Sequence, residues 1–162
     1  MNQAASHDHH DHHELPPFWK RMFTTSNHKD IGSMYLIFAL TMLFCGGTAA
    51  MVIRAELMYP GLQLVQPDFF NQMTTVHGLF MVFGAIMPAF VGFANWMVPM
   101  MIGAPDMALP RLNLFSFWLL PFAFLLLISS VAMSLMGMGS APNFGWTFYA
   151  PLSTKFAPAS TD

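Results

Sequence analysis

Charged side chains and cysteine are both scarce in this 162-residue sequence. Asp, Glu, Lys and Arg make up only 9% of it, whereas an ordinary soluble domain carries roughly 25%. The net charge of −2 comes without any basic stripe, which excludes a nucleic-acid partner because nothing would neutralise its phosphates. Cys45 is the single cysteine, so an internal disulfide and a Cys–Cys metal centre are excluded as well.

Apolar residues, in contrast, make up 55% of the sequence and gather in three long runs. The runs lie near residues 31–53, 73–102 and 112–138, and each exceeds the roughly 20 residues that cross a bilayer. Prolines inside the second and third runs predict kinks. The expected fold class is therefore an all-α integral membrane protein with three transmembrane helices. Because the first thirty residues lack the apolar core of a cleavable signal, we expect the first span to direct its own insertion.

Lysines and arginines are more numerous on one side of these spans. Four precede the first span or lie between the second and third, and two lie on the other side: Lys20, Arg21, Lys29 and Arg111 against Arg54 and Lys155. Such a distribution favours a cytoplasmic N-terminus, with the first loop and the C-terminus outside.

The two ends of the chain are polar. Residues 1–17 hold a histidine-rich tract interrupted by aspartate. This composition cannot bury a core, so we predict a disordered tail whose imidazoles could bind copper, nickel or zinc weakly. Aromatic residues at 143–149 predict an interfacial loop, and residues 154–162 a short C-terminal tail.

A histidine at the outer end of the second span needs an explanation, because ionisable groups are costly in a membrane. His77 is followed by Gly78, which would let a flat ring approach the backbone. Haem iron ligated by histidine is one use of such a site. A structural histidine with a single hydrogen bond explains the position equally well.

A carboxylate lies near the other face of the membrane. Asp106 follows His77 by 29 residues, or roughly 40 Å of helix, and therefore belongs to the opposite side. Asn95 and Asn113 are further polar residues near that face. Together they could collect protons and pass them through ordered water. The alternative, a loop aspartate that caps the third helix, is the more common arrangement.

The end of the first span carries further polar residues on the side of His77. Arg54 either extends its guanidinium to the membrane surface or contacts a haem substituent. Glu56, Gly61 and Gln63 follow in the next loop and offer hard oxygen ligands. They are too few to predict a calcium site by themselves.

Taken together, several strings resemble the opening of subunit I of the haem–copper oxidase family, in its aa3 cytochrome c oxidase branch. They come in the family's order and spacing and cover the chain from about residue 18 to residue 153. The strings are Thr25-Ser26-Asn27-His28-Lys29-Asp30-Ile31-Gly32, Arg54-Ala55-Glu56-Leu57, His77-Gly78, Asn95-Trp96-Met97-Val98-Pro99, Ile102-Gly103-Ala104-Pro105-Asp106-Met107, Pro110-Arg111-Leu112-Asn113, Ser116-Phe117-Trp118 and Gly145-Trp146-Thr147. Pro105 favours the cytochrome c branch, because the quinol-oxidising relatives usually replace it.

The resemblance implies a haem site on the outer side. His77 would be an axial ligand of the iron of low-spin haem a. Arg54 would contact the formyl group of that haem, and Trp146 would lie near its propionates. The loop residues Glu56, Gly61 and Gln63 would match a calcium or sodium site of some members.

It also implies a proton pathway from the inner side. Asp106 would be the entrance carboxylate of the D channel, with Asn95 and Asn113 as its amides and Tyr35 near the mouth. The family commonly has a second asparagine where this chain has Leu114, so the detail of the mouth differs here.

A complete subunit I has twelve spans, so these three would be its first quarter to third. The second haem a ligand, haem a3 and copper B would all come later, and this segment alone is not expected to reduce oxygen. We therefore expect a partial sequence of an oxidoreductase in a bacterial inner membrane. Its partners would be the remaining spans, oxidase subunits II and III, and cytochrome c as electron donor.

Two other classes of protein are consistent with parts of the pattern. Three spans, a histidine-rich tail and methionine pairs such as Met97 with Met101 suit a copper transporter. A non-catalytic membrane fragment is the third alternative. An optical spectrum would separate them, since the outcomes are low-spin haem bands, copper binding without haem, or neither.

Overall fold

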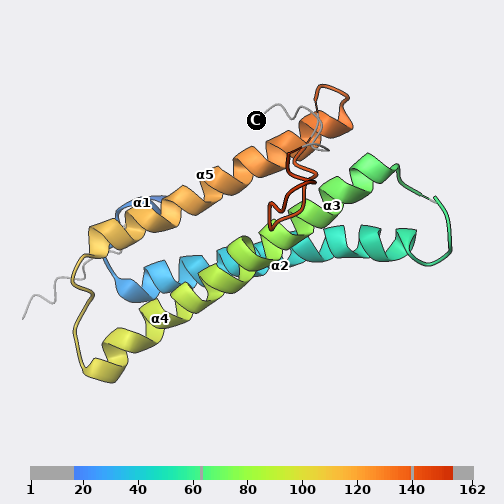
Figure 1. Cartoon of the computed structure of the whole chain (residues 1–162). Helices are drawn as coiled ribbons and strands as arrows, with labels where there is room; N and C mark the ends of the chain where they lie inside the picture. Colours follow the sequence, from blue (N-terminus) through green and yellow to red (C-terminus); the bar gives the residue numbers. More distant parts are fainter. Residues whose placement is uncertain (1–16, 63, 140, 155–162) are drawn as a thin grey trace, which may run out of the picture.

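The computed structural model describes residues 17–62, 64–139 and 141–154, and within them all regular structure is helical (Figure 1). The helices are α1 (Phe18–Thr24), α2 (His28–Glu56), α3 (Pro67–Leu79), the π-helix η1 (Phe80–Ile86), α4 (Met87–Ile102) and α5 (Pro110–Leu135). The predicted histidine-rich tract, Gln63 and residues 155–162 lie outside the described residues.

Three of these helical stretches are long and apolar enough to cross a membrane. They are His28–Glu56, the continuous stretch Pro67–Met101 formed by α3, η1 and α4, and Pro110–Leu135. This confirms the all-α class and the number of predicted spans. The second stretch begins six residues earlier than the predicted position 73, because Pro67 starts its first turn and Asp68 follows it there. His77 consequently lies ten residues, or about 15 Å, from the start of this helix.

Pro88 does not interrupt the second stretch, although a proline cannot donate a hydrogen bond to the preceding turn. The π-helix η1 ends just before it, and the Met87 N–H bonds to the carbonyl of Val82, five residues back. The wider π turn therefore precedes the proline, and the chain continues as α4. Gly103 ends α4 in the left-handed conformation, with φ of 69°.

α2 and α4 approach each other closely through two glycines. A Cβ atom added to Gly32 would lie 2.9 Å from the Gly92 carbonyl oxygen, and one added to Gly92 would lie 3.0 Å from the Gly32 oxygen. Small residues allow this kind of backbone contact between helices in lipid, where packing replaces the hydrophobic effect as the driving force. The contact fixes the first turns of α2 against the middle of α4, near the end of the bundle that holds the start of α2, here called the inner end.

This contact predicts opposite effects for two glycine substitutions in α2. Gly32→Ala should destabilise the bundle by roughly 1–3 kcal/mol, because the new methyl group meets backbone and the Trp96 ring at 2.7 Å. Gly47→Ala is the matched control, since nothing lies within 4 Å and alanine favours a helix by up to about 1 kcal/mol. Thermal unfolding in detergent micelles measures both, and equal melting temperatures for the two variants would contradict the packing.

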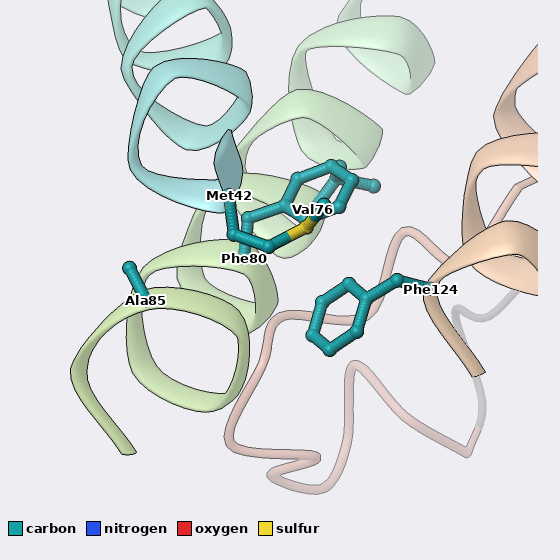
Figure 2. Packing of buried hydrophobic residues seen from close by; sticks show 5 residues of the cluster. All are labelled: Met42, Val76, Phe80, Ala85 and Phe124. Atoms are coloured by element: carbon teal, nitrogen blue, oxygen red, sulfur yellow. The ribbon is translucent and has the colours of Figure 1, made fainter. Parts of the chain in front are cut away.

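Aromatic side chains hold α5 against the other two spans at two levels. At one level Met42, Val76, Phe80, Ala85 and Phe124 form a buried cluster (Figure 2). The rings of Phe80 and Phe124 stack there with centroids 5.5 Å apart. At the inner level Ile31, Tyr35, Leu114 and Phe117 form a second cluster. These contacts place α5 beside α2 and so bring its polar first turns to the inner end of the bundle.

The aromatic segment that the sequence predicts as an interfacial loop makes contacts with α3. Residues 141–154 fold back alongside α3 (Figure 1). Ala141 and Asn143 are buried, and the Gly145 N–H donates to the Thr75 hydroxyl at 3.0 Å. Because Thr75 is fully buried and donates to the Asn71 carbonyl, it gives this segment a fixed attachment point.

Candidate functional sites at the two ends of the bundle

The imidazole of His77 is held by the backbone of α2. Its Nδ1 lies 2.9 Å from the carbonyl oxygen of Gly46. A carbonyl can only accept, so Nδ1 carries a proton, and in the neutral imidazole Nε2 keeps its lone pair. Metal-ligating histidines typically donate their other ring N–H in this way, which fixes both the tautomer and the ring orientation. The side chain is half-buried, and Nε2 is therefore suited to ligate a metal.

The indole of Trp146 packs against the backbone at Gly78. An added Cβ atom would lie 2.5 Å from Cγ and Cδ1 of Trp146. The ring is 42% exposed, so one side covers Gly78 while the rest remains accessible. His77 and Trp146, 69 residues apart in sequence, thus belong to one region of the surface.

Arg54 and Glu56 lie in the last turn of α2, beyond the Gly46 carbonyl that His77 contacts. Arg54 is exposed and lies eight residues, or about 12 Å along the helix, beyond Gly46. Glu56 is buried, and its Oε2 accepts the backbone N–H groups of Leu64 at 2.7 Å and Val65 at 3.1 Å. The carboxylate thereby closes the loop that contains Gly61, whose φ of 97° suits glycine. Glu56 and Gly61 line one cavity of about 520 Å³.

Polar side chains converge at the inner end of the bundle. Asn95 is buried, and its amide donates to the Asn113 Oδ1 at 3.3 Å. The Ser116 hydroxyl donates to the Asn113 carbonyl at 2.7 Å. Tyr35 lies 2.9 Å from the Ser116 oxygen and must be the donor, because the hydroxyl hydrogen of Ser116 is already used. The structure therefore brings three of the four predicted channel residues into one hydrogen-bonded set.

Asp106, the fourth, lies beside this set in the loop before α5. Its Oδ1 accepts the backbone N–H of Met107 at 2.8 Å, and the side chain is half-buried. The capping alternative is wrong: the N-cap of α5 is Leu109, with no side-chain hydrogen bond. Asp106 instead lines a polar pocket of about 360 Å³ together with His28 and Lys29 from the start of α2.

Sequence reasoning missed His28 as a member of this region. His28 is only 5% exposed, and its Nδ1 donates to the Asn95 carbonyl at 2.9 Å. It lies seven residues before Tyr35, on the same face of α2, and this spacing was the available signal. Ser116 was missed as well, because a serine in the first turns of a helix carries no signal of its own.

A bidentate ion pair attaches the segment before α2 to the first turn of that helix. Arg21 donates to both carboxylate oxygens of Asp30, at 2.8 and 2.6 Å. The Asp30 carboxylate raises the pKa of Arg21, so the guanidinium stays charged. Asn27 caps α2 through the Lys29 N–H at 2.9 Å. The start of α2, which carries His28, is therefore well defined.

These features define a multi-span helical membrane protein. The His77 imidazole lies toward one end of the bundle, and the polar region of Asp106, Asn95 and Asn113 lies at the other. Residues 30–161 match the family described as Cytochrome C and Quinol oxidase polypeptide I. The chain belongs to this family. This family match argues against the copper-transporter alternative.

Curated relatives in the same family are cytochrome c oxidase subunits 1 of corynebacteria. The chain is 46% identical to the subunits of Corynebacterium efficiens and Corynebacterium glutamicum over 134 residues, which are 82% of this chain and 22% of each relative. It is 42% identical to the subunit of Corynebacterium diphtheriae over 135 residues, 83% of this chain and 23% of the relative. The chain therefore spans less than a quarter of the length of these relatives.

Proposed function

We propose that this chain is the opening segment of the haem-bearing subunit of a terminal oxidase, which passes electrons from cytochrome c to oxygen and pumps protons. Family membership and the similarity to curated cytochrome c oxidase subunits support this proposal. The remaining spans, with haem a3 and copper B, would complete the subunit, and subunits II and III would complete the enzyme. The segment would lie in a bacterial inner membrane with its N-terminus in the cytoplasm, as its basic residues favour.

The hydrogen bond between His77 Nδ1 and the Gly46 carbonyl carries the haem assignment. It presents the unprotonated Nε2 in a fixed orientation, and this is what an axial iron ligand requires. Haem a, when bound, would supply reversible one-electron transfer. Trp146 would cover one edge of the site through its contact with Gly78, and Arg54 would place a positive charge toward the haem substituents.

The inner region suits proton uptake. Asp106 lines a polar pocket at the end of the bundle, where its carboxylate can take a proton from water. Asn95, Asn113 and Tyr35 lie behind it and offer donors and acceptors that can orient a chain of waters. Their role is to position and transfer protons, and Asp106 supplies the carboxylate among them.

Glu56, Gly61 and Gln63 would form a calcium site in the outer loop. Glu56 supplies a buried carboxylate at one wall of the cavity that Gly61 also lines. Hard oxygen donors of this kind suit calcium. Gln63 lies outside the described residues, so its part follows from the family resemblance alone.

The proposed function is tested by purifying the native membrane complex through an affinity tag on this chain. The purified complex should show low-spin haem a absorption, contain copper and iron, and consume oxygen when reduced cytochrome c is added. A complex with copper and no haem, or with neither, would contradict the proposal. The same preparation provides the material for the variants described below.

A further inference from the structure

Met107 contacts both the acidic and the amide part of the inner region. Its backbone N–H donates to the Asp106 Oδ1 at 2.8 Å. Its thioether sulfur accepts the side-chain N–H of Asn113 at 3.2 Å. Met107 therefore contacts both Asp106, the proposed proton-collecting carboxylate, and Asn113, the nearest amide. The side chain is half-buried, which places the sulfur between the loop and α5.

The sulfur helps to define how the Asn113 amide is turned. The Asn113 Oδ1 accepts from Asn95, while its Nδ2 donates to Met107. If the amide turned by 180°, Nδ2 would face the amide donor of Asn95, and two donors cannot bond to each other. An acceptor at the position of the Met107 sulfur therefore favours one orientation, with the amide oxygen toward the interior and the amide N–H toward the loop.

A thioether is a weak acceptor, and this makes the contact replaceable. A water molecule is a better acceptor for the Asn113 N–H and can replace the sulfur during proton uptake, whereas the sulfur holds the amide between uptake events. The flexible, unbranched methionine side chain can move aside at little cost. An oxygen acceptor at the same place would keep the orientation, while a purely apolar side chain of equal size would lose it.

We infer that Met107 is a positioning residue of the proton-channel mouth: its sulfur orients the Asn113 amide next to Asp106 and yields to water during proton uptake. This inference rests on the proposed role of Asp106 as the channel entrance. It adds a residue that acts through Asn113 and does not itself titrate.

The test compares three methionine variants in the complete oxidase. Met107→Leu keeps the volume and removes the acceptor, so proton uptake in reconstituted vesicles should slow by about two- to tenfold, the range that one hydrogen bond spans. Met107→Gln restores an acceptor and should return the rate to near the normal value. Met101→Leu is the matched control, since Met101 is 77% exposed in the last turn of α4, and it should have no effect.

Haem spectra distinguish positioning from structural damage, because all three variants should keep normal haem absorption. Normal proton uptake in Met107→Leu would overturn the inference, and so would equal losses in Met107→Leu and Met107→Gln. Asp106→Asn is measured in parallel. If it too pumps normally, the proposed channel entrance fails; if it stops pumping while Met107→Leu is normal, only the role of Met107 fails.

Discussion

Asp106→Asn in the complete oxidase should stop proton pumping and lower turnover on the order of tenfold or more, while haem absorption stays normal. Asparagine has the size of aspartate and keeps an oxygen that can accept the Met107 N–H, so the loop before α5 should be retained. The variant loses only the carboxylate. Because Asp106 does not cap α5, a stability effect on that helix is not expected.

The measurement is oxygen consumption together with proton release in reconstituted vesicles. Asp106→Glu should lose much less activity, since it keeps a carboxylate in the same pocket. Asp68→Asn is the matched control, because Asp68 is an exposed carboxylate in the first turn of α3, far along the chain from the inner end. Normal pumping in Asp106→Asn would remove the channel-entrance assignment and leave that of His77 untouched.

The three spans could be predicted from sequence because lipid imposes a simple condition. A spanning helix must satisfy its own backbone and present about 20 apolar residues, so long uncharged runs identify it. The helix that contains the second span starts six residues before the predicted apolar run, at Pro67. Pro67 and Asp68 are good helix-start residues, but residues 67–72 are too polar to count as part of an apolar run.

The two functional regions could be predicted only in part. The sequence singled out His77 and Asp106 as polar residues that need an explanation and placed them toward opposite ends of the helices. Their partners could not be predicted from it, because the contacts join distant segments: Gly46 with His77, and His28 with Asn95. Such pairs depend on how α2 packs against α3 and α4, which no local pattern specifies.

The ring against Gly78 illustrates the same limit. Gly78 was interpreted as leaving room for a flat ring beside His77, and in the structure the indole of Trp146 contacts it. The sequence predicted Trp146 to lie in a surface loop, since aromatic residues after a span usually anchor at the interface. What the sequence did not predict is the attachment of this loop to α3, where the Gly145 N–H donates to the buried Thr75 hydroxyl.

His77→Ala in the complete oxidase should abolish low-spin haem binding and stop electron flow to oxygen. Alanine removes Nε2, the nitrogen that the Gly46 contact orients as a ligand. The second span contains no further histidine that could replace it. The effect is larger than any packing loss, because electron transfer depends on the cofactor itself. Haem at the second site of the enzyme should be retained.

The most direct test is the absorption spectrum of the reduced oxidase in two matched variants, His77→Ala and His28→Ala. Both histidines donate Nδ1 to a backbone carbonyl at 2.9 Å, but they lie in different helices and His28 belongs to the inner region. We expect the low-spin haem band to disappear in His77→Ala and to remain in His28→Ala. A low-spin band retained in an assembled His77→Ala enzyme would show that another residue ligates the iron and would contradict the account.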